Sequence, residues 1–181
     1  MKVLFIGNSH TYVHDMPLLF KKKVIESGND CHVTMIAHPG WTLEKHNANP
    51  EVRFNILYGD YDYVVCQEYA HPFGPAENLY KGMRILKNYI DQTKSKMIIY
   101  PTWAAKNNPS AQTVMSEAHK TIAEELGDML APVDVRWTDI VKNHPEINLF
   151  GPDGEHPSDE GSNLIATAIY DTIMSDIDLN K

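Results

Sequence analysis

The chain has 181 residues, of which 43% are hydrophobic and 22% are charged, which excludes a disordered protein and favours one domain over residues 1–181. Lys and Arg number 16 against 24 Asp and Glu, and the net charge of -8 argues against nucleic-acid binding, which needs a basic surface. The two cysteines, Cys31 and Cys66, make no disulfide framework, and no apolar run reaches the roughly 20 residues of a membrane span.

Short apolar runs alternate with helical patterns along the whole chain. Buried strands are expected where a compact apolar run lacks polar alternation, and helices where apolar residues recur every three or four positions. Gly28 and Gly127 are stop signals for two of the helices. In chain order we predict a strand at 3–6, a helix at 16–27, a strand at 32–37, a helical excursion within 42–59, a strand at 61–66, a helix at 79–90, a strand at 97–100, a helix at 109–126, a strand at 131–135 and a helix from 159 onward.

Apolar strands separated by helices are typical of a parallel sheet that is buried on both faces. Right-handed crossovers then give an α/β protein, a three-layer α/β/α sandwich with a five-stranded parallel sheet. Ligands of such sheets gather at the carboxyl ends of the strands. The residues to inspect therefore follow the strands, and they are 7–10, 38–42, 67–69, 101–103 and the 153–158 loop before the last helix.

Three of these post-strand residues have the chemistry of a serine hydrolase. Ser9 follows the first strand, while Asp153 and His156 lie three positions apart near the other end of the chain. A serine hydroxyl becomes a good nucleophile when a neighbouring base takes its proton, and histidine does this best. A carboxylate fixes the histidine tautomer and stabilises the imidazolium. We therefore predict Ser9, His156 and Asp153 as catalytic residues.

The same edge of the sheet offers hydrogen-bond donors for a developing oxyanion. The candidates are the backbone N–H of Ser9, the backbone N–H of Gly40 and the side-chain amide of Gln67. A glycine permits close approach of a ligand, and a carboxamide donates while it stays neutral. These three groups form the predicted oxyanion hole.

Four segments resemble the sequence blocks of the SGNH (GDSL-type) hydrolases: Gly7-Asn8-Ser9, Gly40, Gln67 and Asp153-Gly154-Glu155-His156. Asn8 replaces the acid of the usual Gly-Asp-Ser block, and Gln67-Glu68 stands where the usual third block supplies an asparagine. The Gln-Glu version is similar to the carbohydrate-acetylesterase-like branch of the superfamily. The resemblance covers nearly the whole chain. It implies a flavodoxin-like fold and an enzyme that removes acyl groups from esters.

These residues together predict a serine esterase that forms an acyl-enzyme on Ser9 and releases it with water. We expect the substrate to be a small-molecule ester with a short acyl group such as acetyl, because no lid segment or large apolar insertion is apparent. An acylated sugar is one candidate. No metal or organic cofactor is expected, since the other histidines show no ligand spacing.

Further side chains in the post-strand loops are candidates for substrate contacts. An aromatic pair suits a sugar face or an apolar acyl or aryl group, although both tryptophans could equally pack beneath loops. The predicted contacts are His10, Trp41, Glu68 and Trp103, with Tyr12 as a further candidate.

Two other interpretations stay open. A non-catalytic carbohydrate- or partner-binding module could keep the fold, and a flavodoxin-like domain could bind a cofactor. Residues 7–12 hold one glycine and two bulky rings, which does not favour a phosphate-binding loop. The first predicted strand starts directly after Lys2, so no secretory signal is expected and we predict a cytoplasmic protein. The sequence indicates no oligomeric state.

Overall fold

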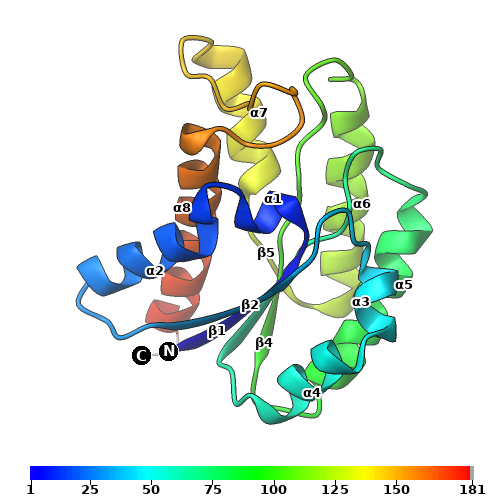
Figure 1. The fold of residues 1–181 in the computed structure, drawn as a ribbon, viewed down its shortest axis with the longest axis vertical. Helices are drawn as coiled ribbons and strands as arrows, with labels where there is room; N and C mark the ends of the chain where they lie inside the picture. The colour runs from blue at the N-terminus through cyan, green and yellow to red at the C-terminus, as the bar shows by residue number, and fades with distance from the viewer. Residues whose placement is uncertain (180–181) are drawn as a thin grey trace.

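The computed structural model describes residues 1–179, and these residues build a parallel five-stranded sheet with helices on both faces (Figure 1). The strand order is β2-β1-β3-β4-β5, and every neighbouring pair is parallel. The predicted three-layer α/β/α sandwich is therefore confirmed. The strands are β1 (Lys2–Gly7), β2 (His32–Ala37), β3 (Tyr63–Cys66), β4 (Lys96–Ile99) and β5 (Met129–Leu130).

The apolar strands divide their side chains between two separate cores. Val3 and Phe5 of β1 pack on one face of the sheet, and Leu4 and Ile6 pack on the other, all without exposed surface. Successive residues of a strand point to opposite faces, so an uninterrupted apolar run is required when both faces are covered. This double burial explains why the strands lack polar alternation.

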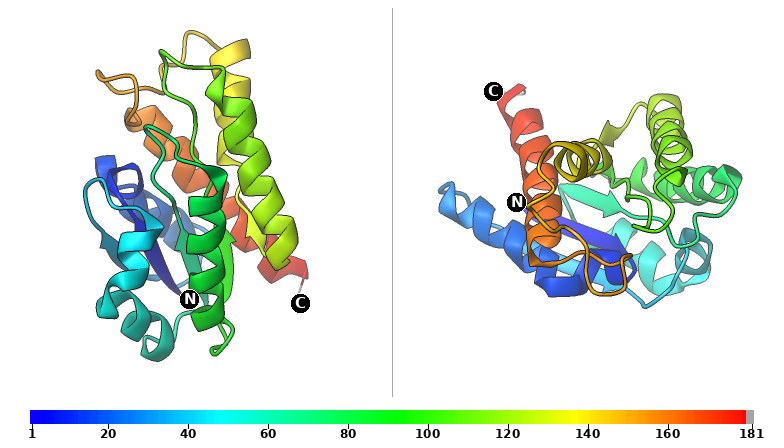
Figure 2. Two further views of the ribbon diagram at one scale, coloured as in Figure 1. Left: turned by 90° about the vertical axis from the view of Figure 1, so that its right-hand side faces the viewer. Right: turned by 90° about the horizontal axis from the view of Figure 1, so that it is seen from above.

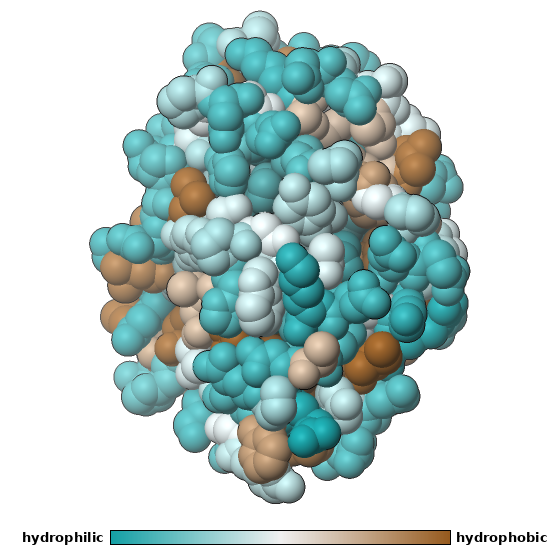
Figure 3. All heavy atoms as spheres, turned by 45° about the vertical axis from the view of Figure 1, so that its right-hand side comes forward, coloured by the Kyte–Doolittle hydropathy of each residue, from teal (hydrophilic) through white to brown (hydrophobic). Residues whose placement is uncertain are grey.

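The helices form two layers, which Figure 2 shows on opposite sides of the strands. One layer contains α2 (Met16–Glu26), α7 (Val133–Asn143) and α8 (Asp159–Leu179). The other contains α3 (Leu43–Ala48), α4 (Pro50–Tyr58), α5 (Ala76–Ile90) and α6 (Ala111–Leu126). The face of the molecule seen in Figure 3 is mostly hydrophilic, with scattered apolar residues. Among residues 1–179, no helix combines the length and the apolar character that crossing a bilayer requires.

The predicted strand at 131–135 is wrong. The fifth strand is β5, which ends at Leu130, and α7 begins at Val133. Pro132 occupies the position before this helix, where its missing N–H costs nothing, whereas a proline inside a sheet removes a ladder hydrogen bond. Val133 and Trp137 are buried one helical turn apart on α7. The alternating Ala131–Val135 segment concealed this helical spacing.

The turn after β1 leaves room for no side chain at position 7. A Cβ on Gly7 would collide with Thr11 Oγ1 and would lie 2.5 Å from Gln67 Oε1. The chain then enters a short helix, α1 (Ser9–Tyr12), which the sequence did not predict, followed by a 3-10 turn over Val13–Asp15. The first helical turn thus begins immediately after the strand, at Ser9.

The loop before α8 is brought to the same end of the sheet. Ser162 of α8 donates from its hydroxyl to the carbonyl of Val13 at 3.1 Å, and Phe150 forms a β-bridge with Pro157. Ser158 caps the start of α8 by accepting the N–H of Gly161 at 3.1 Å. These contacts place the 151–158 loop beside α1.

Replacement of Gly161 tests this packing. An alanine Cβ there would lie against the carbonyl oxygen of Leu149 and 2.9 Å from the Trp137 ring. Although Gly→Ala in a helix ordinarily adds about 1 kcal/mol of stability, we expect Gly161→Ala to lower the free energy of unfolding by about 1–3 kcal/mol. Urea denaturation measures this change. Asn163→Ala, at an exposed position of the same helix, is the control and should be neutral or slightly stabilising. A variant at position 161 at least as stable as the wild type would contradict the packing argument.

Candidate active site

Ser9, His156 and Asp153 form one hydrogen-bonded chain. Ser9 Oγ lies 2.7 Å from His156 Nε2, and His156 Nδ1 lies 2.5 Å from Asp153 Oδ2. The residues come from the first turn of α1 and from the loop before α8, so segments 147 positions apart meet here. With Nδ1 protonated towards the carboxylate, Nε2 is the bare nitrogen that accepts the Ser9 hydroxyl. The structure therefore brings together the three residues that the sequence singled out.

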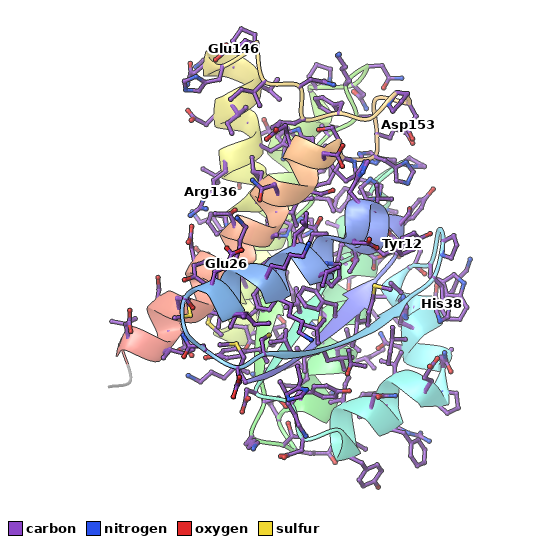
Figure 4. All side chains as sticks on the ribbon, turned by 60° about the vertical axis from the view of Figure 1, so that its left-hand side comes forward. Tyr12, Glu26, His38, Arg136, Glu146 and Asp153 are labelled. Carbon is purple, nitrogen blue, oxygen red and sulfur yellow. The ribbon has the colours of Figure 1, made fainter. Side chains whose placement is uncertain are left out.

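The backbone of the loop orients the Asp153 carboxylate and stabilises its charge. Asp153 Oδ1 accepts the backbone N–H groups of Glu155 and His156, each at 3.0 Å, while Oδ2 faces the His156 ring. The Glu155 N–H, together with the side chain and N–H of His156, holds the pKa of Asp153 well below its usual range. Gly154, with φ of +73°, makes the turn between them. In Figure 4, Asp153 is labelled on this loop, above Tyr12. The carboxylate consequently stays charged over a wide pH range.

Asn8 fastens two loops of the site together. Its Oδ1 accepts the backbone N–H of His10 at 3.1 Å and caps α1, and its Nδ2 donates to the carbonyl of Trp41 at 3.0 Å. The side chain is wholly buried. An aspartate in this place could accept the first bond but could not donate the second. Asn8 therefore ties the Ser9 turn to the loop that contains Gly40.

Two of the predicted oxyanion donors have free backbone N–H groups. Gly40 is exposed, has φ of +65°, and lies in the loop that Asn8 holds through Trp41. Within residues 1–179, neither the N–H of Gly40 nor that of Ser9 donates a hydrogen bond. Both N–H groups are therefore available to a ligand.

Gln67, the third predicted donor, is placed differently. Its Oε1 accepts the Asn8 backbone N–H and the Thr11 hydroxyl, each at 2.9 Å, and its Nε2 donates to the carbonyl of Glu68. The side chain is wholly buried. The structure thus uses this amide to hold the turn after β1 and does not direct it towards a ligand at Ser9. Glutamine is one methylene longer than the usual asparagine, and its amide reaches beneath the turn after β1. The sequence alone did not reveal this placement.

The predicted substrate contacts need two corrections. Trp103 has no exposed surface, because it stacks on Trp137 with ring centroids 3.7 Å apart and donates from Nε1 to the carbonyl of Glu155. His10 is 3% exposed, enclosed by aromatic rings that include Trp103. Their almost complete burial leaves neither side chain the surface that a substrate contact requires. These residues support the site from beneath.

The other predicted contacts lie nearer the surface or beside a cavity. Trp41 is half-buried and packs on His38, and Tyr12 is half-buried on α1. Glu68 accepts the N–H groups of Leu43 and Tyr69, and burial raises its pKa. It lines a cavity of about 580 Å³ between α3 and α5. Glu68 thus fastens the backbone of two loops.

The sequence analysis missed His71. Its Nδ1 lies 3.0 Å from His10 Nε2, and its Nε2 lies 2.9 Å from the carbonyl of Trp103. The only signal was its place four residues after Gln67, in the loop that follows β3. No group of three or more His, Cys, Asp or Glu side chains within residues 1–179 could hold a metal ion.

A second cavity, of about 470 Å³, opens between the loop after β3 and the start of α6. His71 and Glu155 line it, and Glu155 is the neighbour of His156 in the chain. Most of its other lining is apolar: Ala70, Pro72, Phe73, Ala105, Ala111, Val114 and Met115. This cavity could hold an apolar group of a ligand next to His71.

Removal of the Gln67 side chain tests its assignment. Gln67→Ala leaves the Asn8 N–H and the Thr11 hydroxyl buried without an acceptor, so we expect the free energy of unfolding to fall by about 2–5 kcal/mol. Thr11→Val, which removes one donor and keeps the acceptor, should cost about 1 kcal/mol. Chemical denaturation compares the three proteins. Unchanged stability of Gln67→Ala combined with lost activity would instead favour the oxyanion role expected from the sequence.

No protein-family model and no curated protein matches this chain. Among solved structures, a protein described as an SGNH hydrolase from Slackia heliotrinireducens is 24% identical, with a TM-score of 0.78 over 96% of this chain and 98% of its own. A psychrotrophic esterase from Pseudoalteromonas sp. is 14% identical, with a TM-score of 0.74 over 98% of each chain. An acetyl xylan esterase from Geobacillus stearothermophilus is 18% identical, with a TM-score of 0.71 over 95% and 93%. The chain has the fold of these hydrolases.

Proposed function

We propose that this protein is a serine esterase with Ser9 as nucleophile, His156 as general base and acid, and Asp153 as the group that orients His156. The observation that carries the proposal is the chain of contacts from Ser9 Oγ through both nitrogens of His156 to Asp153. This arrangement can raise the nucleophilicity of a hydroxyl and stabilise the imidazolium that results.

The reaction follows from the positions of these groups. As Ser9 Oγ attacks the ester carbonyl carbon, its proton passes to His156 Nε2 and the carbonyl oxygen becomes an oxyanion. The free N–H groups of Ser9 and Gly40 donate to that oxygen. His156 then gives the proton to the leaving alkoxide, which departs as an alcohol and leaves Ser9 acylated. Water repeats the sequence and releases the carboxylic acid.

The substrate that we propose is a small neutral ester, with an acetylated sugar as one candidate. A net charge of -8 disfavours polyanionic substrates. The apolar cavity beside His71 and Glu155 suits a small apolar part of such an ester. One structural neighbour with the same fold is named an acetyl xylan esterase, which supports the inclusion of acetylated sugars in the substrate panel.

Replacement of Ser9 tests the proposal directly. We expect wild-type protein to hydrolyse members of a panel of aryl acetates and acetylated sugars, and Ser9→Ala to lower kcat by about 10⁴-fold or more. A fluorophosphonate probe should label Ser9 in the wild type. Ser27→Ala, an exposed serine at the end of α2, is the matched control and should keep full activity.

Two results would refute the esterase. Wild-type protein that is inactive on every ester, and unlabelled by the probe, would favour a binding module that retains the fold. Full activity in Ser9→Ala would place the chemistry on another residue.

The pH dependence tests the role of His156. A protonated imidazole has no lone pair for the Ser9 proton, so kcat/KM should fall as pH drops from 8 to 5 and protons occupy His156 Nε2. Asp153 does not contribute to this fall, because its pKa is held far below that range. A pH series from 5 to 8 with a neutral acetate ester measures the profile. A flat profile would exclude His156 as the base.

A further inference from the structure

Three histidine rings lie against one another beneath the proposed active site. The rings of His10 and His156 stack with centroids 4.8 Å apart and planes 21° apart, and those of His10 and His71 are also 4.8 Å apart. His156 has both nitrogens engaged by Ser9 and Asp153. The proposed ester chemistry does not use His10 or His71.

The hydrogen-bond partners determine which nitrogens of these two rings hold protons. His71 Nε2 faces the carbonyl of Trp103 at 2.9 Å, and a carbonyl only accepts, so Nε2 of His71 holds the hydrogen. In a neutral ring Nδ1 of His71 is then bare. His10 Nε2 faces this bare nitrogen at 3.0 Å and the Glu155 carbonyl at 3.3 Å, whereas His10 Nδ1 faces only Asn8 Oδ1 at 3.3 Å. Asn8 Oδ1 already accepts the backbone N–H of His10, so the two acceptors at Nε2 favour the hydrogen of His10 on that nitrogen.

Burial favours the neutral form of both rings. Burial, followed by the repulsion from His71 and His156, lowers the pKa of His10 to about 3, and burial also lowers the pKa of His71. A second proton on His71 would place two N–H groups against each other between the rings. The titratable groups that face His10 are His71 from the loop after β3, His156, Glu155 and Asp153 from the loop before α8, and Tyr100 after β4, whose buried hydroxyl donates to the His10 carbonyl.

We propose that His10 is a positioning residue for His156, a neutral ring fixed in its Nε2–H form by His71, whose face stabilises His156 while that side chain is an imidazolium. The inference rests on the proposed function, because it requires His156 to take the Ser9 proton. A cation within about 6 Å of an aromatic face is attracted by it, and the stacking distance satisfies this condition. A protonated ring in the same place would repel the cation.

No proton passes between His10 and His156 in this scheme. The proton that leaves Ser9 Oγ resides on His156 Nε2 and departs with the alcohol, while His10 keeps its hydrogen towards His71 throughout. His10 therefore acts on the charged intermediate state and not on substrate binding, which agrees with its 3% exposure. Its replacement should change kcat and leave KM nearly unaltered.

Two variants of His10 separate the aromatic face from simple filling of space. His10→Leu removes the face, so we expect kcat to fall about tenfold and the acidic limb of the kcat profile to move about 0.5–1 pH unit lower. His10→Phe keeps the face and should restore the position of the limb and kcat to within about threefold of wild type. His144→Leu, an exposed histidine, is the control. Equal kcat and equal limbs in His10→Leu and His10→Phe would overturn the proposal.

Nitrogen-15 NMR of the wild-type imidazoles gives a second measurement that needs no variant and no activity. We expect the signals of both residues to show Nε2 protonated and Nδ1 bare at pH 8, and those of His10 to stay unchanged down to pH 5. Titration of His10 in this range, or a proton on its Nδ1, would overturn the inference. Failure of the proposed function is distinguished by the Ser9 experiments, which leave these signals unaffected.

Discussion

The 2.7 Å contact between Ser9 Oγ and His156 Nε2 depends on the parallel arrangement of the sheet. Because all five strands run in the same direction, the segment that leaves the interior strand β1 opens at the same edge of the sheet as the loop that enters α8. The Ser162–Val13 hydrogen bond joins α8 to the turn that follows α1, and the Ser158–Gly161 hydrogen bond caps the start of α8. Without this pairing, the serine and the histidine would be isolated polar residues on separate loops.

Side-chain amides perform much of the work of holding the site rigid. Asn8 and Gln67 are wholly buried, and each both donates and accepts hydrogen bonds to neighbouring loops. A carboxylate at either position would lack the donor and would bring a buried charge near Asp153. Two carboxylates remain at this edge of the sheet, Asp153 on an exposed loop and the buried Glu68, and backbone N–H groups satisfy both. The two amides and Glu68 support the loops of the site, and Asp153 is the carboxylate in contact with His156.

The sequence predicted most strands, and it predicted the Ser9, His156 and Asp153 grouping, because apolar runs and post-strand positions are local signals. It failed where the outcome depends on distant partners. The post-strand position of Trp103 indicated a substrate contact, but in the folded protein this ring stacks on Trp137 of α7. Gln67 has the right chemistry for an oxyanion donor, but the turn at Gly7 draws its amide inward. Neither neighbour is visible in the local sequence pattern.

The separation of 147 positions between Ser9 and His156 also has a consequence for synthesis of the protein. At a translation rate of about 5–20 residues per second, roughly 7–30 s pass between the addition of Ser9 and that of His156. During this interval the nascent chain holds the serine without its partner and without α8, which covers one face of the sheet. The serine therefore meets its histidine only after the ribosome has supplied the second half of the fold.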